Sequence, residues 1–411
     1  MIPIAMPLFD PPPTRHPAQK AASSSNRNVS SNKRYTVIDT VTVPRTDEQA
    51  QIMSVLTDIH QRLMVVGHGH LPNDFPELGN TKPEYFGISL ITRTGHVFDV
   101  GDYDIPFTLQ SLSHPFLFSL ALDDWGRELV LNYVNIRPTN GATLHQLETT
   151  GYLPENPLVR SGALAIAGLV NGDNPTERLN RIIDRYSQYV GHKIHVDIST
   201  FMSSRQRNHH LRALGHLMIN AGLVDQTRLD EILDLYLQQA SVLTTGHDLA
   251  MMASTLANGG INPITRRRVM NAEHVKDVLS AMAISGMGHQ SSTWLFNVGM
   301  PATNSVSGGL LAVMPGQFGV AIYSPLLDEE GLSIRGRMVC EELSQRLDCH
   351  MLSGLPPNQT LTDLLANPVP APSMAPASPM AHTASKPPGL QGDDTEPVII
   401  PLLENDLFAQ V

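Results

Sequence analysis

The stretch QSLSHPF, residues 110–116, places a serine and a histidine where they could act together. Ser111 follows a strand-like pattern and precedes an apolar run, where a serine nucleophile is often found. His114 comes three residues later, and residues three apart on a helix share a face. An imidazole, with an ordinary pKa of about 6.5, suits a general base, and a helix N-terminus would keep it neutral. The spacing predicts a Ser111 nucleophile with His114 as base; the alternative is a helix N-cap serine and a polar helix histidine.

The 17 histidines of the chain raise the question of a metal site. Two clusters stand out, GHGH at 67–70 and NHH at 208–210. Neither has the i, i+4 histidine pair with a carboxylate that is typical of a helical zinc site. We therefore predict no metal and no cofactor.

Composition limits the partners and the compartment. The chain has 411 residues, a net charge of −11 and no extended basic cluster, so we expect neither nucleic acid nor an anionic membrane as a partner. Cys340 and Cys349 are nine positions apart in a helical pattern and would not readily bridge, which favours reduced thiols and a cytoplasmic location. The sequence contains no apolar run long enough for a membrane span and no pattern of a secretion signal.

Three segments differ in composition. Residues 1–45 are rich in Pro, Ser and Asn and are predicted to be a disordered arm, whereas residues 46–353 hold the folded domain. Residues 354–411 form a proline-rich tail that regains apolar residues at 396–411. This last stretch is either a docking peptide for a protein partner or a weakly ordered end.

The folded segment is predicted to belong to the α+β class. Its periodicities run from an amphipathic helix through a strand hairpin and a long helical region to further strands and a closing helix. This order predicts an antiparallel sheet, formed by both ends of the domain and flanked by helices, with a helical subdomain inserted between. The segments are the helix within 47–66, strands 85–91 and 96–102, helices within 228–241 and 246–260, strands 308–316 and 318–325, and the helix within 333–347.

Four stretches carry a resemblance to a known family. They are GDYDIPFTLQSLSHPF, ENPLVRSGALAIAGLV, LANGGINPITRRRVM and the long run from WLFNVGMPATNSVSGG to LSIRG. In this order, over roughly 300 residues, the chain resembles the serine-dependent glutaminases, which share the β-lactamase and penicillin-binding-protein (DD-peptidase) architecture. The resemblance implies hydrolysis of L-glutamine to L-glutamate and ammonia, a small amide or amino-acid ligand, and a homodimer or homotetramer.

The resemblance also implies roles for individual residues. The family's Gln-Ser-x-Ser-Lys stretch corresponds to Gln110–His114, so Ser111 is the nucleophile and His114 stands in place of the lysine base. Tyr236 matches a catalytic tyrosine, although it also falls on the apolar face of its predicted helix. The residues implied to contact substrate are Gln110, Ser111, Arg160, Asn208, Tyr236 and Val306, the last through its backbone amide.

Several positions depart from the family pattern. Arg160 replaces an asparagine and would favour an anionic ligand, unless it is a surface residue of a drifted loop. His209 and His210 fall near the site, as exposed residues or as a replacement base. The other replacements are Ser204 for a glutamate, Leu211 for an asparagine, Gly288 and Asp74 for tyrosines, and Thr303, Asn304 and Ser305 for a Lys-Ser-Gly strand.

Two functions therefore remain open. The first is a serine amidohydrolase of the glutaminase type, with activity that is weak, altered or lost toward glutamine. The second is an inactive relative that keeps the fold for binding or as a scaffold. The lost substrate groups lead us to expect little turnover of glutamine, because an unpaired ligand ammonium is costly to desolvate.

Overall fold

The computed structural model describes residues 47–74, 76–139 and 153–353. The predicted arm 1–45 and tail 354–411 lie outside this part, so both remain predictions. The helices are α1 (Asp47–Leu63), α2 (Pro76–Gly79), α3 (His114–Val130), α5 (Arg160–Gly168), α6 (Pro175–Val190), α7 (Ile198–Arg207), α8 (His209–Asn220), α9 (Leu229–Ala240), α10 (Gly246–Ala257), α11 (Ala272–Ser285), α12 (Ser291–Asn297) and α13 (Ile334–Leu347). The strands are β1 (Gly87–Thr92), β2 (Val97–Gly101), β3 (Phe107–Thr108), β4 (Leu243–Thr244), β5 (Ala302–Asn304), β6 (Gly309–Met314) and β7 (Phe318–Tyr323).

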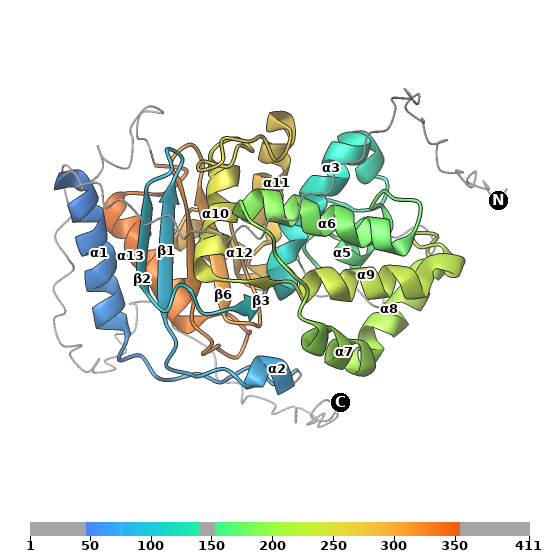
Figure 1. The fold of residues 1–411 in the computed structure, drawn as a ribbon, viewed down its shortest axis with the longest axis horizontal. Coiled ribbons are helices and arrows are strands. Elements are labelled where there is room, and N and C mark those ends of the chain that lie inside the picture. The colour runs from blue at the N-terminus through green and yellow to red at the C-terminus, as the bar shows by residue number, and fades with distance from the viewer. Residues whose placement is uncertain (1–46, 75, 140–152, 354–411) are drawn as a thin grey trace, which may run out of the picture. The chain divides into compact units, whose positions relative to one another are not determined.

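A five-stranded antiparallel sheet forms the centre of the fold. Its strand order is β2-β1-β7-β6-β5, so the two predicted hairpins meet where β1 pairs with β7. Both ends of the domain supply strands, as the sequence predicted, and the helical region, which comes between them in the chain, lies beside the sheet (Figure 1). A separate two-stranded ribbon joins β3 to β4 and leads the chain to Ser111.

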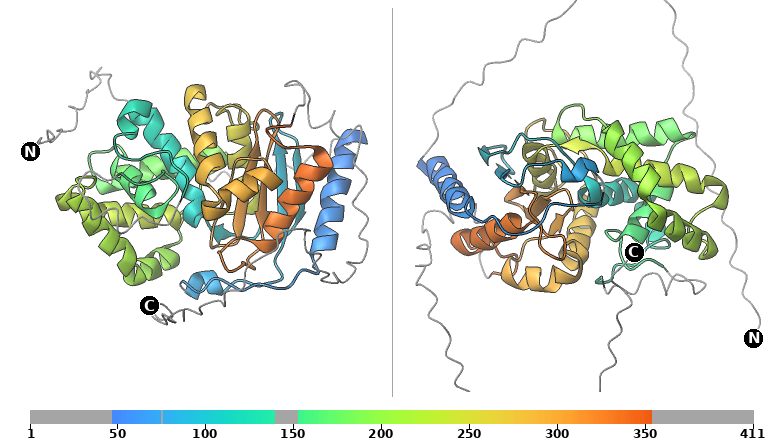
Figure 2. Two further views of the ribbon diagram at one scale, coloured as in Figure 1. Left: turned by 180° about the vertical axis from the view of Figure 1, so that it is seen from behind. Right: turned by 90° about the horizontal axis from the view of Figure 1, so that it is seen from below.

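Side chains of the sheet alternate between two hydrophobic clusters. In β1, Leu90 packs on one face with α1 and α13, while Ile91 packs on the other with the helical region. Figure 2 shows α1 (blue) and α13 (red-orange) side by side over the first face. α10 covers the second face so closely that a Cβ at Gly319 would lie 2.2 Å from the Ser254 amide nitrogen. Only glycine fits there, which fixes α10 against the sheet.

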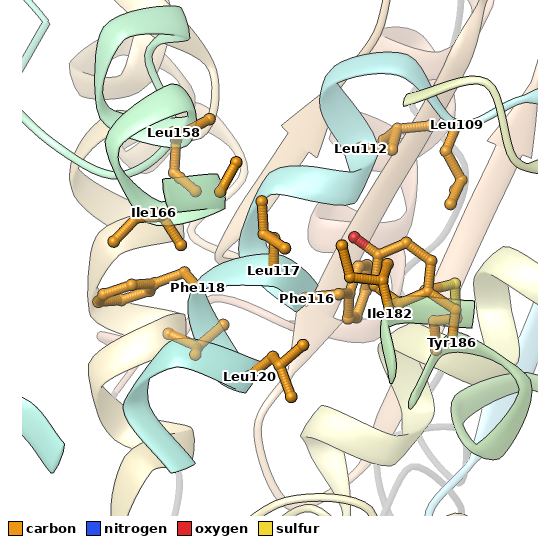
Figure 3. Close-up of a cluster of buried hydrophobic side chains, with 14 of the residues drawn as sticks. Leu109, Leu112, Phe116, Leu117, Phe118, Leu120, Leu158, Ile166, Ile182 and Tyr186 are labelled. Atoms are coloured by element: carbon orange, nitrogen blue, oxygen red, sulfur yellow. The ribbon is translucent and has the colours of Figure 1, made fainter. Parts of the chain in front are cut away.

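The helical subdomain is built around α3. Residues Phe116–Leu122 of this helix are all buried, and the helix packs against α5, α6 and α11. Figure 3 shows Phe116, Leu117, Phe118 and Leu120 among Leu158, Ile166, Ile182 and Tyr186. A helix that is apolar all round is expected in the middle of a core rather than at its surface. The first turn of α3, which carries His114 and directly follows the turn with Ser111, is therefore held by packing on all sides.

Three further observations concern the cysteines, the length of the helices and the grouping of metal-binding side chains. Cys340 and Cys349 are both buried and free, and burial raises the pKa of each thiol. None of the described helices has the length and apolarity to cross a membrane. In the described ranges, no group of three or more His, Cys, Asp or Glu side chains is placed to hold a metal ion.

Candidate active site

Ser111 lies in a single 3-10 turn, Gln110–Ser113, directly before α3. This turn packs against α9 and against β5 and β6, so the sheet and the helical subdomain meet at the serine. Gln110 has φ of 50°, a left-handed conformation that is uncommon outside glycine. Its side chain donates to Thr108 Oγ1 at 3.0 Å, and its carbonyl accepts the Ser113 hydroxyl at 2.5 Å. Strained backbone of this kind is often found at functional sites.

The Ser111 hydroxyl donates to the Asn304 carbonyl oxygen of β5 at 2.9 Å. The N-cap part of the alternative is wrong, because Leu109 is the N-cap of the 3-10 turn and Ser113 that of α3; His114 does lie in the helix. A carbonyl oxygen accepts a hydrogen bond but cannot take the proton. In this arrangement the serine is anchored to the sheet and its proton points at a group that is not a base.

His114 is buried, with both ring nitrogens in hydrogen bonds. Nδ1 lies 2.8 Å from the Leu158 carbonyl oxygen, and Nε2 lies 3.2 Å from the Tyr236 hydroxyl. Since the carbonyl only accepts, Nδ1 must carry the proton, and the neutral ring then accepts from Tyr236 through Nε2. Neither of these contacts is to Ser111. The ring thus links the first turn of α3 to the segment before α5 and to α9.

The electrostatics keep this histidine neutral. Burial lowers the pKa of His114 to about 4, against a smaller opposite effect of the Leu158 hydrogen bond and a further lowering by the Arg160 charge. The helix N-terminus predicted a neutral ring, but burial is the main cause instead. Tyr236 is 7% exposed, and burial raises the pKa of its hydroxyl while Arg160 lowers it.

The other predicted contact residues lie on neighbouring elements. Arg160 is the first residue of α5 and is exposed, and Val306 follows β5 two residues after Asn304. Asn208 caps α8, where its side chain accepts from the Leu211 amide at 3.3 Å, so a structural role already accounts for it. His209 and His210 are exposed. The replacing residues Ser204 and Leu211 are buried, with 4% and 1% of their surface exposed.

Sequence reasoning missed the groups that hold this site together. The Leu158 and Asn304 carbonyls position His114 and Ser111, but every residue has a carbonyl, so no sequence signal marks them. Beneath the turn, the Tyr186 hydroxyl donates to Gln239 Oε1 at 2.8 Å and lies 3.1 Å from the Ser113 carbonyl oxygen. A buried tyrosine and glutamine on facing helices could have been suspected as a pair.

Comparison with known proteins identifies the family. The model of the glutaminase family matches residues 69–352. The chain is 44% identical over 301 residues to a glutaminase of Trichormus variabilis, which covers 73% of this chain and 90% of the relative. The chain belongs to the glutaminase family. A glutaminase 1 of Escherichia coli is 35% identical over 281 residues, 68% of this chain and 90% of the relative.

Solved glutaminase structures share the fold of this family member. The glutamate form of the protein Mglu superposes with a TM-score of 0.71 at 35% identity, covering 74% of this chain and 71% of Mglu. A probable glutaminase of Bacillus subtilis, complexed with 6-diazo-5-oxo-L-norleucine, gives a TM-score of 0.67 at 26% identity, covering 73% and 96% of the two chains. The predicted α+β, β-lactamase-like fold of this glutaminase-family chain is thereby confirmed.

Proposed function

We propose that this member of the glutaminase family binds a small amide or amino-acid ligand at the Ser111 site but hydrolyses L-glutamine only slowly or not at all. One observation carries the proposal: the Ser111 hydroxyl donates to a backbone carbonyl, and His114, which stands in place of the lysine base, has other partners for both ring nitrogens. A serine hydroxyl is a weak nucleophile unless a neighbouring base removes its proton. The lysine that the family resemblance places at position 114 would supply that base.

The weak basicity of His114 supports the same conclusion. A general base works best when its pKa lies near the working pH. With a pKa of about 4, the His114 ring is neutral at pH 7 but holds a proton poorly. Charging it would also place an imidazolium in a buried site close to the Arg160 guanidinium. Proton transfer from Ser111 to His114 is therefore unfavourable for two reasons: the ring binds a proton weakly, and the imidazolium that forms is buried close to another positive charge.

The substrate groups favour binding over efficient turnover. Ser204 and Leu211 are buried where the resemblance places a glutamate and an asparagine. Neither side chain can pair with the ammonium of glutamine, and misplacement of a substrate alone can reduce the rate by about 100-fold. One Mglu structure is of the glutamate form, and the Bacillus subtilis structure is a complex with the amino acid 6-diazo-5-oxo-L-norleucine. We infer that a ligand of similar size occupies this site.

A second candidate is residual amide hydrolysis through Ser111. It is favoured by the hydrogen bond between His114 and Tyr236, which joins the residue replacing the lysine to a retained tyrosine. If the ring turned toward Ser111, His114 would act as base and Tyr236 would assist proton transfer. The amides of Ser111 and Val306 would then stabilise the oxyanion. The identity to proteins named glutaminase supports this reaction class.

Ammonia release separates the two candidates. Purified protein is assayed with glutamine, asparagine and other small amides beside the Trichormus variabilis glutaminase. We expect rates at least 100-fold below that enzyme, and equal rates for wild type and Ser111→Ala. Release that depends on Ser111, or labelling of Ser111 by a fluorophosphonate, would establish the second candidate. In that case His114→Lys should raise the rate and change its pH profile.

Three further expectations belong to the proposal. We expect a homodimer or homotetramer, which light scattering coupled to size exclusion would measure. We expect a cytoplasmic location. The tail 396–411 remains a candidate peptide for a protein partner, which deletion of this segment and comparison of captured proteins would test.

A further inference from the structure

Arg160 lies close in sequence to Leu158, whose carbonyl oxygen binds the His114 ring. It is the first residue of α5, two positions after the carbonyl of Leu158 that binds His114 Nδ1. Its side chain is exposed and takes part in none of the ion pairs among the described residues. A guanidinium has five donors in a planar fork, so one that also contacts the Tyr236 hydroxyl still has donors with which to bind a carboxylate through two hydrogen bonds.

The guanidinium acts on the Ser111 site rather than on open solvent alone. Burial raises the pKa of the Tyr236 hydroxyl. The charge of Arg160 and a hydrogen bond from its side chain act in the opposite direction and lower this pKa. The same charge adds to the lowering of the pKa of His114. Since Tyr236 OH lies 3.2 Å from His114 Nε2, the three side chains form one connected group.

The helix that begins at Arg160 adds to the positive field. α5 has nine residues, and its first backbone amides have no acceptor within the helix, as at every helix start. The N-cap residue Val159 provides no side-chain acceptor for them either. Ser161, the next residue, is 2% exposed, and its hydroxyl has no hydrogen-bond partner in the part of the chain that the structure describes. Helix N-termini and free hydroxyls are both suited to anions.

The positions where the resemblance implies an acidic and an amide group carry no negative charge. Ser204 and Leu211, which replace the acidic and amide groups, are neutral and buried. One carboxylate does reach α7, because Glu77 Oε1 accepts the Ser203 hydroxyl at 2.5 Å. Glu77 is therefore an alternative partner for a ligand ammonium, and the test includes it.

We propose that Arg160 makes the Ser111 site selective for a carboxylate ligand without an α-ammonium, such as the monoamide of a dicarboxylic acid or the dicarboxylate itself. This inference rests on the proposed function and names its ligand class. Glutamine at neutral pH carries an ammonium that finds no partner at Ser204, whereas its deamino analogue glutaramate carries only the carboxylate that Arg160 can bind.

Calorimetry with unreactive protein tests the proposal. The ligands are glutaramate, glutarate, glutamine, the neutral diamide of glutaric acid, and inorganic phosphate, all titrated into full-length Ser111→Ala. We expect glutaramate to bind at least tenfold more tightly than glutamine, the diamide or phosphate. Adding Arg160→Gln should weaken glutaramate at least tenfold, about 1.4 kcal/mol, and leave the diamide unchanged. Arg160→Lys should fall between, because lysine keeps the charge but not the fork.

The controls assign each failure to one cause. Arg267→Gln removes the same charge from an exposed position in the loop between α10 and α11 and should change nothing. Unchanged glutaramate binding in Arg160→Gln would overturn the inference, as would phosphate binding as tightly as glutaramate. Glutamine binding tightly and being lost in Glu77→Gln would overturn it as well. Rapid glutamine hydrolysis by wild type would instead overturn the proposed function, and that assay is independent of these affinities.

Discussion

The protonation of His114 should make the fold less stable as the pH falls. Burial lowers the pKa of this ring from 6.5 to about 4 in the folded protein, so between these values the unfolded chain binds more protons than the folded one. Stability contributed by the neutral ring is present above pH 6.5 and is lost as the pH falls toward 4. This is the reverse of a histidine that gains a carboxylate partner on folding.

The size of the effect follows from the two pKa values. Each unit of difference corresponds to about 1.4 kcal/mol, so the full loss below pH 4 is about 3 kcal/mol. Linkage with these values gives a loss of about 2 kcal/mol between pH 7 and pH 5. His192 acts in the opposite sense, since its hydrogen bond to Asp248 raises its pKa despite an opposing effect of burial. The difference between variants therefore reports His114, whereas the total pH dependence does not.

Urea unfolding at pH 7, 6 and 5 would measure this difference. Wild type should lose about 2 kcal/mol more of its unfolding free energy over this range than His114→Gln, in which an amide can keep hydrogen bonds to Leu158 and Tyr236. The matched variant His192→Gln should lose more than wild type. Equal slopes for wild type and His114→Gln, or a histidine NMR signal that is absent in His114→Gln and titrates near pH 6.5, would refute the reasoning.

Two further predictions concern buried polar side chains and their hydrogen bonds. Arg335 is 3% exposed and donates to the backbone carbonyls of residues 66 and 83–85. Arg335→Met should therefore lower the free energy of unfolding in urea by roughly 3 kcal/mol. A decrease of less than about 1 kcal/mol would contradict this. Tyr186→Phe should lower the free energy of unfolding by about 1–3 kcal/mol, because it leaves Gln239 Oε1 buried without a hydrogen bond. Adding Gln239→Leu should restore much of this free energy. No recovery would show that the Tyr186–Gln239 pair is not the cause.

Hydrophobic periodicity and chain order carried most of the fold prediction. The hairpin of β1 and β2, the final strands β6 and β7, and the helices at α1, α10 and α13 all appear where their patterns indicated. These elements could be predicted because a strand or helix must bury one face, and the spacing of apolar residues records which face that is. The pairing of β1 with β7 follows once both ends of the domain contribute to one sheet.

The candidate site was predictable only in part. The spacing of Ser111 and His114 and the family resemblance, which added Tyr236, brought these three residues into one group, and the last two do lie in hydrogen-bond contact. The direction of each hydroxyl and ring was not predictable. It depends on the carbonyls of Leu158 and Asn304, which come from segments 44 and 193 residues away from the groups they bind.

The sequence alone therefore determined the family, the order of elements and the identities of the chemical groups, including the histidine where the resemblance implies a lysine. Tertiary structure alone decided what state those groups are in. Packing around α3 removes water from His114 and sets its pKa, while β5 supplies the acceptor for the Ser111 proton. Both effects are produced by contacts between distant segments, and the free energy of a charge depends on everything packed around it rather than on its neighbours in the chain.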